Sequence, residues 1–241
     1  MSGSILITGA TSGIGKQLAV DYADSGWRVI ACGRNERVLE ELSNHSSLID
    51  TLRFDVTDYD ETKQALSSLN FVPQTWVFNA GDCEYMNNGE VDAKLMARVM
   101  NVNVIGAANC IEACQAYFKP GHKIVIVGSI ASEVALPRAE AYGASKAAVS
   151  YFARTLALDV EKKGIQVVTV FPGFVETPLT DKNTFEMPML ISVKQASDSI
   201  RKQLSANKCF IYFPARFTSI LRFISLLPYR WQARLTRKLV S

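Results

Sequence analysis

The sequence has 241 residues, of which 48% are hydrophobic and 20% are charged. This length and composition are typical of a folded protein with a sizeable core, and we expect a single domain. No basic and apolar leader opens the sequence, and no uninterrupted apolar run reaches about 18 residues. We therefore predict a cytoplasmic protein without a signal peptide or a membrane span.

Cysteine and histidine usage argues against disulfides and metal chemistry. The five cysteines include no C-x-x-C pair, which favours reduced thiols over a disulfide framework. The two histidines, His45 and His122, are far apart in the sequence and form no metal-ligand pattern. We predict no metal site, and a Ser-His-Asp hydrolase is disfavoured for the same reason.

Charge is distributed unevenly along the chain, although the net charge is only +3. Residues 199–241 contain nine lysines or arginines and no aspartate or glutamate. The part before them has 17 basic and 23 acidic residues, a net charge of −6. The C-terminal segment is thus a cationic module on an acidic body.

A short apolar run, Ser4–Thr8, is followed by a glycine-rich turn and then by hydrophobic residues at helical spacing. This order predicts a strand, a turn and a helix. Glycines let the backbone approach a phosphate, and the N–H groups at the start of the helix attract it. The turn therefore indicates a nucleotide phosphate site, with a purely structural turn as the alternative. The candidate phosphate-binding residues are Gly9, Thr11, Ser12, Gly13, Ile14 and Gly15.

A second predicted strand, Trp27–Cys32, ends at Gly33 and Arg34. An acidic residue at this place accepts from the ribose 2′-hydroxyl of NAD, whereas an arginine suits the 2′-phosphate of NADP. Arg34 therefore points to NADP, with a solvated arginine at a helix entry as the alternative. The next strand, Thr51–Phe54, leads to Asp55, which could accept from an adenine amine or help to start the following helix.

Three further apolar runs, Thr75–Phe78, Lys123–Gly128 and Ile165–Phe171, predict buried strands. Strands that alternate with helices argue for a parallel sheet with right-handed crossovers. Open sheets of this kind bind ligands at the carboxyl ends of their strands. The polar and glycine-containing segments found so far all lie at such ends.

Tyr142 and Lys146 are four residues apart, so on a helix their side chains would share one face about one turn apart. A neighbouring cation favours an ionised phenol, so Tyr142 could act as a general acid or base. Ser129, at the end of a predicted strand, could reach the same carbonyl group. The pair taken alone could also be a surface accident. Asn103 lies in an apolar helical stretch and needs partners there, so it could kink the helix or hold a water.

Six motifs occur together between about residues 4 and 180. They are T-G-x-x-x-G-x-G at Thr8–Gly15, N-A-G at Asn79–Gly81, N-x-x-G from Asn103, Ser129, Y-x-x-x-K at Tyr142 and Lys146, and P-G-x-x-x-T at Pro172–Thr177. Their order and spacing resemble those of the short-chain dehydrogenase/reductase family. No single motif decides the resemblance, which rests on the coincidence of all six.

The resemblance implies a Rossmann-like α/β fold, a doubly wound and three-layered domain whose parallel sheet has about seven strands. The seventh strand is expected at Cys209–Phe213. The NADP-binding and catalytic domain would comprise residues 1–213, and residues 214–241 would be a basic helical extension of it. A homodimer or homotetramer is also expected from the resemblance.

The resemblance further assigns roles to individual residues. Tyr142 would donate a proton to a substrate carbonyl during reduction, or remove one from an alcohol during oxidation. Lys146 would bind the nicotinamide ribose and lower the pKa of the phenol, Ser129 would orient the carbonyl, and Asn103 would position a water. The remaining expected cofactor contacts, with Val175 and Thr177 at the carboxamide, are Val56, Asn79, Ala80, Gly81, Tyr142, Lys146, Pro172, Gly173, Val175 and Thr177.

Two positions depart from the family pattern. Phe78 replaces the first asparagine of N-N-A-G, which could alter the loop after the fourth strand. Ser12 stands in the glycine turn where many NADP-dependent members have a basic residue. The expected preference for NADP (NADPH) over NAD therefore rests on Arg34.

The variable walls of the expected pocket are residues 82–86, 131–136 and a flap over residues 178–191 that contains Phe185 and Met187. These walls are largely apolar, and methionines adapt to varied shapes. An apolar or lipid-like carbonyl or alcohol is therefore the expected small-molecule substrate. Simple packing of the flap is the alternative.

Residues 217–239 carry apolar residues at helical spacing, interrupted by Pro228 and accompanied by arginines. The apolar positions are Phe217, Ile220, Leu221, Phe223, Ile224, Leu227, Trp231, Leu235 and Leu239. A basic amphipathic helix could make peripheral contact with an anionic membrane. It could instead pack against the body or a second subunit. No nucleic-acid partner is expected, because a basic tail without a recognition motif is weak evidence for one.

Two classes of function follow. The first is an NADP(H)-dependent oxidoreductase that interconverts a carbonyl and a secondary alcohol. It is favoured because Asn103, Ser129, Tyr142 and Lys146 are all present. The second is a catalytically silent NADP-binding regulatory or scaffold protein of the same fold.

Overall fold

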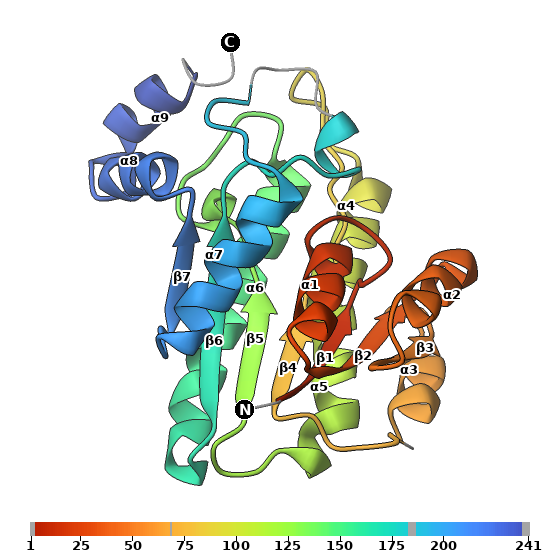
Figure 1. The fold of residues 1–241 in the computed structure, drawn as a ribbon. Coiled ribbons are helices and arrows are strands. Elements are labelled where there is room, and N and C mark those ends of the chain that lie inside the picture. Colours follow the sequence, from red (N-terminus) through yellow and green to blue (C-terminus); the bar gives the residue numbers. More distant parts are fainter. Residues whose placement is uncertain (1–2, 68, 183–186, 238–241) are drawn as a thin grey trace.

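The computed structural model describes residues 3–67, 69–182 and 187–237. Its centre is a seven-stranded sheet in the order β3-β2-β1-β4-β5-β6-β7, with all neighbouring strands parallel. Helices cover both faces of the sheet (Figure 1). The predicted Rossmann-like, doubly wound fold is thus confirmed.

The strands form at the short apolar runs of the sequence. They are β1 (Ser4–Thr8), β2 (Arg28–Gly33), β3 (Ile49–Arg53), β4 (Thr75–Phe78), β5 (Lys123–Val127), β6 (Gln166–Pro172) and β7 (Phe210–Phe213). Most bounds agree with the predicted ones to within a residue. The strand β3 begins two residues earlier than predicted, because Ile49 pairs with Val29 of β2.

Nine helices lie between and after these strands in the described residues. They are α1 (Gly13–Asp24), α2 (Glu36–His45), α3 (Tyr59–Leu66), α4 (Ala93–Met100), α5 (Gly106–Cys114), α6 (Glu140–Val160), α7 (Val193–Ser205), α8 (Ala215–Ser225) and α9 (Tyr229–Arg237). Side chains of Asn35, Asp58, Asp92 and Ser192 accept hydrogen bonds from the first turns of α2, α3, α4 and α7. These caps fix where the helices begin.

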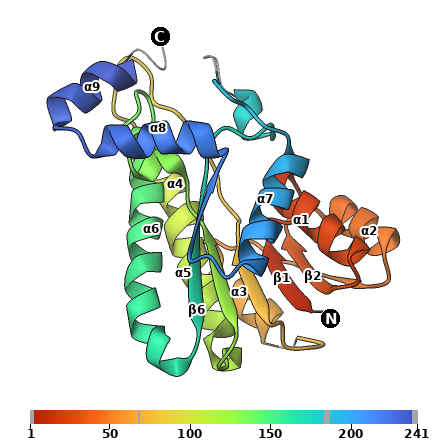
Figure 2. The ribbon, with the colours of Figure 1, turned by 60° about the vertical axis from the view of Figure 1, so that its left-hand side comes forward.

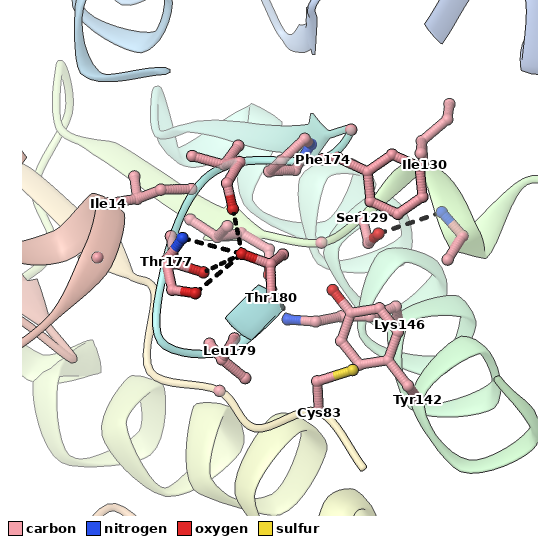
Figure 3. Close-up of a pocket in the computed structure, with 18 of the residues that line it drawn as sticks. Ile14, Cys83, Ser129, Ile130, Tyr142, Lys146, Phe174, Thr177, Leu179 and Thr180 are labelled. Atoms are coloured by element: carbon pink, nitrogen blue, oxygen red, sulfur yellow. Dashed lines mark hydrogen bonds between the residues drawn. The ribbon is translucent and has the colours of Figure 1, made fainter. Parts of the chain in front are cut away.

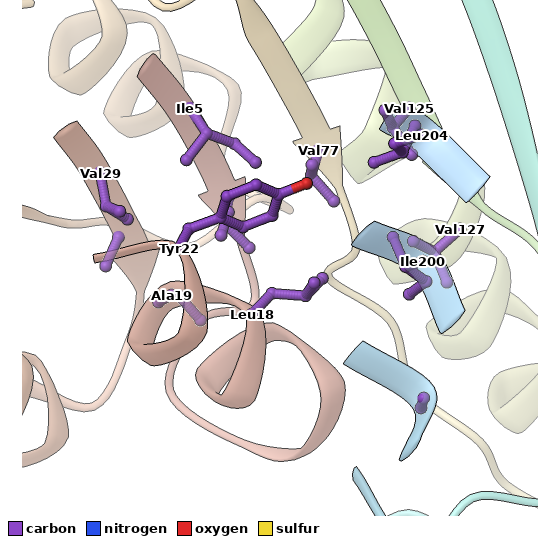
Figure 4. Close-up of a cluster of buried hydrophobic side chains, with 14 of the residues drawn as sticks. Ile5, Leu18, Ala19, Tyr22, Val29, Val77, Val125, Val127, Ile200 and Leu204 are labelled. Carbon is purple, nitrogen blue, oxygen red and sulfur yellow. The ribbon is translucent and has the colours of Figure 1, made fainter. Parts of the chain in front are cut away.

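The two faces of the sheet have separate hydrophobic cores. On one face, Leu18 of α1 and Ile200 of α7 pack over strand residues that include Ile5 (Figure 4). On the other, Trp76 of β4 packs among residues of α5 and α6. Neighbouring residues such as Ile5 and Leu6 serve opposite faces, as the alternation of a strand requires. Both faces of the sheet are therefore buried.

A polar link joins α1 to α7 beside the first core. The buried Asp21 accepts hydrogen bonds from the Ser197 hydroxyl at 2.6 Å and the Lys194 ammonium at 3.1 Å. Burial alone would raise the pKa of Asp21, but the hydrogen bonds from Ser197 and Lys194 outweigh it and lower that pKa. The ionised Asp21 side chain of α1 therefore helps to hold α7 in place.

The C-terminal segment crosses the carboxyl ends of the strands. Phe217, Leu221 and Ile224 of α8 are buried against Ile130 and Val134. None of the helices within the described ranges is long and apolar enough to span a membrane. Phe185 and Leu239, two of the apolar residues singled out in the sequence, lie outside the described residues.

Candidate active site

Two adjoining hollows open at the carboxyl ends of the strands. The larger is lined by the glycine turn, the ends of β4, β5 and β6, and residues of α6 and α8 (Figure 3). The smaller contains Thr11, Arg34, Asp55 and Val56. Since both are lined by Gly9, Ser12, Ala80 and Gly81, they form one continuous site. All predicted site residues line it except Gly15 and Asn103, which lie behind its wall.

The glycine turn has a backbone that other residues cannot adopt without strain. Gly9 and Gly13 have φ of +66° and +50°, in the left-handed region. A Cβ on Gly15 would lie 2.3 Å from the carbonyl oxygen of Gly9. The helix α1 begins at Gly13, and the N–H groups of a first helical turn have no acceptor within the helix. The turn thus offers close backbone approach and N–H donors to an anion.

The N-A-G segment braces this turn. The Thr8 hydroxyl oxygen accepts from the backbone N–H groups of Asn79 and Ala80, at 3.1 and 3.2 Å. The Asn79 amide nitrogen donates to the carbonyls of Thr8 and Gly9, at 3.1 and 3.3 Å. These bonds tie the end of β4 to the end of β1. Phe78, which departs from the family pattern, is buried in the core beneath.

Arg34 lies at the rim of the smaller hollow and pairs with Asp55, at 3.1 Å between Nη1 and Oδ2. The Arg34 side chain is nevertheless 73% exposed, so its remaining donors can reach a ligand. Partial burial acts to raise the pKa of Asp55, but hydrogen bonds from Thr57 and Arg34 outweigh it and lower that pKa. The hollow therefore has one anionic and one cationic group at its rim.

Tyr142 and Lys146 lie together on α6, as their spacing predicts (Figure 3). The Lys146 ammonium is 5.8 Å from the centre of the Tyr142 ring, and it donates to the Val127 carbonyl at 3.0 Å. Ser129 follows β5 and faces the same hollow, and its hydroxyl oxygen accepts from the Ala131 N–H at 3.1 Å. A phenol, an ammonium and a hydroxyl thus converge on one space.

Burial dominates the protonation of this group. It raises the pKa of the Tyr142 phenol well above its ordinary value; the Cys83 thiol adds to the rise, and a hydrogen bond with Ser129 opposes it. Burial also lowers the pKa of Lys146 to about 8. The lowering of the phenol pKa by Lys146 that the resemblance implied stays a prediction, since burial, Cys83 and Ser129 are the causes of the shift seen here.

Asn103 lies in a π-helical segment, Asn101–Ile105, between α4 and α5. Its amide oxygen accepts from the Asp82 N–H at 2.7 Å, and its amide nitrogen donates to the Asp82 carbonyl at 2.9 Å and the Ser145 hydroxyl at 2.8 Å. Single π-helical turns inside helices are frequent at functional sites. Here the segment connects the loop after β4 to α6.

The P-G-x-x-x-T segment forms the wall opposite Tyr142. Thr180 accepts from the Thr177 N–H at 2.9 Å and lies 2.7 Å from the Val175 carbonyl oxygen, which closes this segment into a compact loop. A Cβ on Gly173 would lie 2.7 Å from the Phe217 ring. Glycine at this position therefore lets α8 pack directly on the end of β6.

The structure adds roles and one residue that the sequence did not predict. Ser145 was not singled out, and it holds Asn103 together with Asp82, which was expected only as a pocket wall. Thr8 was expected only as the first residue of the glycine motif, and it holds the N-A-G segment. Phe217 and Leu221, expected only as part of the apolar tail, line the larger hollow. The position of Ser145 inside the Y-x-x-x-K motif, about one helical turn from Tyr142, is the sequence signal that could have found it. In the structure its hydroxyl donates to the Tyr142 carbonyl.

Within the described residues, no group of three or more His, Cys, Asp or Glu side chains is arranged to hold a metal ion. None of the five cysteines forms a disulfide, and four of them are buried. Cys83 is the one that lines the larger hollow, where it lies beside Tyr142 (Figure 3).

Comparisons with known proteins agree with this architecture. An "Uncharacterized oxidoreductase" of Myxococcus xanthus is 31% identical over 233 residues, which is 92% of each chain. "Sulfoacetaldehyde reductase 2" of Chromohalobacter salexigens is 34% identical over 190 residues, or 75% of each chain. A solved short-chain dehydrogenase from Burkholderia cenocepacia, in complex with NADP, has the same fold, with a TM-score of 0.85, 24% identity and 97% of each chain covered.

The family comparison covers the segment that holds the motifs. Residues 4–187 match the family described as short chain dehydrogenase. This range includes the glycine turn, Ser129, Tyr142, Lys146 and the loop to Thr180. On the family match and the full-length relative together, the chain belongs to the short-chain dehydrogenase/reductase family of oxidoreductases.

Proposed function

We propose that the chain is an NADP(H)-dependent oxidoreductase that interconverts a carbonyl and a secondary alcohol. The observation that carries this proposal is the convergence of Ser129, Tyr142 and Lys146 on one hollow that continues to the glycine turn and Arg34. The catalytic residues in this proposal are Asn103, Ser129, Tyr142 and Lys146.

The residues present fit a dinucleotide. The cradle at Gly9–Gly15 would suit the pyrophosphate, because its glycines let the backbone approach a phosphate and α1 begins at Gly13 with N–H groups that have no acceptor within the helix. Arg34 would bind the 2′-phosphate, and Asp55 the adenine amine. Lys146 would bind the nicotinamide ribose, and the Thr177 region the carboxamide. When bound, the nicotinamide cofactor supplies a hydride for reduction or accepts one in oxidation.

The protein side of reduction is proton delivery. Burial keeps Tyr142 protonated, so its hydroxyl can donate to a carbonyl oxygen in the hollow. The Lys146 ammonium then stabilises the phenolate that forms, and the Ser129 hydroxyl donates to the same carbonyl oxygen and polarises it. In oxidation the same groups act in reverse.

The hydrogen bonds of Asn103 limit the role that it can take in the reaction. Both hydrogens of its amide nitrogen are already donated to Asp82 and Ser145, so its side chain can accept but cannot donate a further hydrogen bond. A water at this residue would therefore donate to Asn103. Its established contacts also position the loop after β4 against α6.

Two observations support NADP over NAD. Arg34 follows β2 where an acidic residue would suit NAD, and the Burkholderia cenocepacia relative of the same fold binds NADP. Asp55 holds the guanidinium in place through one of its donors while leaving it largely exposed. The ion pair thus orients the Arg34 side chain at the rim of the smaller hollow.

The substrate proposed is apolar. The larger hollow has a mainly hydrophobic wall, made of Ile130, Ala131, Leu136, Phe174, Leu179, Phe217 and Leu221 among others. Such a wall would bind an alkyl chain by burying it, at about 25 cal/mol per Å² of apolar surface. Sulfoacetaldehyde, named for one relative, is small and anionic and would gain little from it.

The test is NADPH consumption by the full chain over medium-chain ketones and aldehydes of increasing length and over sulfoacetaldehyde. We expect kcat/KM to rise with chain length and to exceed that for sulfoacetaldehyde by at least about tenfold. Leu179→Asp should reduce the chain-length dependence, whereas Glu176→Gln, on the exposed side of the same loop, should not. Equal or better turnover of sulfoacetaldehyde would refute the apolar substrate. NADPH binding without turnover of any compound would favour the silent regulatory protein.

A further inference from the structure

The helices α8 and α9, with the turn between them, carry large apolar and basic side chains that are exposed together. Six large apolar residues of this segment are exposed, and so are five arginines. We call this set the tail surface; it comprises Ile220, Phe223, Leu226, Tyr229, Trp231 and Leu235, and Arg216, Arg222, Arg230, Arg234 and Arg237. Figure 2 shows α8 lying across the strand ends and α9 projecting beyond the body.

The helix α8 is apolar on two sides. Phe217, Leu221 and Ile224 are buried against the body. Phe223 is 65% exposed and Leu226, just after the helix, is 82% exposed. Packing of the tail on its own body therefore buries these three large apolar residues and leaves the six of the tail surface exposed. Several large apolar side chains left exposed on one short segment indicate an interaction site.

The position of α9 is fixed relative to α8. The Gln232 amide donates to the carbonyls of Ser225 at 3.1 Å and Leu227 at 2.8 Å. Trp231 and Leu235 are one turn apart on α9, and both are exposed. The Arg234 guanidinium lies 5.7 Å from the centre of the Trp231 ring, so basic and apolar groups share one surface.

Charge indicates the occupant of this surface. Residues 199–241 contain no aspartate or glutamate, so the tail surface has no acidic residue of its own segment. In a two-fold dimer through this surface, the same patch would face itself and bring arginines against arginines. Nucleic acid would neutralise the arginines but leave Leu226 and Ile220 in water. An anionic lipid surface satisfies both groups, because it supplies negative headgroups and an apolar boundary.

We propose that the tail surface docks the protein on anionic membranes. Arginines would contact the lipid headgroups, while Phe223, Leu226 and Trp231 would enter the boundary between headgroups and acyl chains. Tryptophan and tyrosine are suited to this depth, because their rings have an apolar body and a polar tip. Docking of this kind lays the helices on the membrane and does not span it.

Docking would also bring the membrane close to the candidate site. The inner side of α8 contributes Phe217 and Leu221 to the larger hollow, while the outer side contributes Phe223 to the tail surface. One helix therefore separates the hollow from the lipid. A lipid-derived carbonyl or alcohol is then the substrate class, a step that rests on the proposed function, whereas docking itself does not.

The experiment is co-sedimentation of the full chain with two kinds of vesicle. One is pure phosphatidylcholine, and in the other about one lipid in three is the anionic phosphatidylglycerol. We expect binding to the anionic vesicles, weak binding to the neutral ones, and a loss of binding as salt is raised. Circular dichroism and the thermal unfolding midpoint of each variant establish that it is folded.

Two pairs of variants test the two kinds of group. Phe223→Ser with Leu226→Ser, and separately Arg230→Gln with Arg234→Gln, should each weaken binding to anionic vesicles by about tenfold or more. Matched controls are Leu158→Ser on α6, a residue that is 71% exposed, and Lys162→Gln with Lys163→Gln in the short helical turn Glu161–Lys163 that follows α6. The controls should bind as the wild type does.

The docking proposal is overturned if the wild type does not bind anionic vesicles, or if both pairs of tail variants bind as tightly as it does. A change of oligomeric state in the tail variants, without vesicle binding by the wild type, would assign the surface to a protein interface instead. Turnover of carbonyl compounds is measured separately in the absence of vesicles. Failure of docking and failure of the proposed activity are therefore distinguishable.

Discussion

Arg34 shows what a residue type at one position can and cannot predict. Its place after β2 predicted a contact with a 2′-phosphate. Its ion pair with Asp55 could not be predicted, because the two residues follow the ends of different strands and meet only when β2 and β3 pair. The pair orients a side chain that would otherwise be solvated, and so supports a role at the rim of the site.

Replacement of this arginine tests the cofactor preference. Arg34→Ala should weaken NADPH binding by about 10- to 100-fold, the effect of losing one or two charge-assisted hydrogen bonds, and leave NADH binding nearly unchanged. Fluorescence titration of both cofactors gives the two dissociation constants. Arg37→Ala, three residues on and 88% exposed, is the control. Equal loss of NADH and NADPH affinity would contradict this role.

Lys146 is the clearest case of a group whose pKa the fold changes. Its pKa is about 8 in the folded chain and near the ordinary value of about 10.4 when unfolded. Between these values the unfolded chain binds a proton that the folded chain does not, so stability gains from Lys146 as pH rises. Below about pH 8 the buried ammonium is a cost.

A pH series measures this cost. Relative to Lys146→Met, the wild type should gain about 1 to 2 kcal/mol in free energy of unfolding between pH 7.5 and about 9.5. Urea unfolding of both proteins at each pH gives the difference, in which titration of other groups cancels. A difference that stays constant across this range would show that Lys146 is not buried as described.

At the scale of elements, Asn103 was expected in a helix that could kink. The π-helical form was not predictable, because it depends on Asp82 and Ser145, which are far from Asn103 in sequence. The strand ends were predictable, since parallel strands place their carboxyl ends at one edge of a sheet whatever the details of packing. Local motifs thus predicted where the site lies but not how its parts are held.

The link between α1 and α7 carries a prediction of its own. Asp21→Asn should destabilise the protein by about 1 to 3 kcal/mol at pH 7, because Ser197 and Lys194 lose a buried charged acceptor. The lowered pKa of Asp21 means that this stability is present above the ordinary carboxyl pKa and is lost as pH falls below it. Urea unfolding should therefore show a smaller difference in the free energy of unfolding between wild type and Asp21→Asn at about pH 3.5 than at pH 7.

The control for this variant is Asp198→Asn. Asp198 also pairs with Lys194, at 2.9 Å, but its side chain is 55% exposed. Exposed ion pairs contribute little, so this change should cost at most about 1 kcal/mol. Equal effects of the two substitutions would indicate that burial of Asp21 is not what makes it stabilising.

For the whole molecule, the alternation of apolar runs and helical segments predicted the sheet, because both faces of a parallel sheet must be covered. The fate of the tail was left open by the sequence, since an apolar stripe does not reveal which side meets the body. In the structure, the apolar residues of the tail fall into two groups. Phe217 and Leu221 line the site, whereas Phe223 and Leu226 are exposed. This separation depends on how α8 packs against the body, which the sequence pattern does not show.

The chemical proposal for the whole molecule is that Tyr142 supplies a proton where a bound nicotinamide supplies a hydride. The most direct measurement is NADPH oxidation by wild type and Tyr142→Phe with an apolar ketone, together with NADPH affinity by fluorescence. The account predicts turnover by the wild type, a fall in kcat of about 10²- to 10⁴-fold in the variant, and unchanged NADPH affinity. Turnover by Tyr142→Phe at the wild-type rate would contradict it.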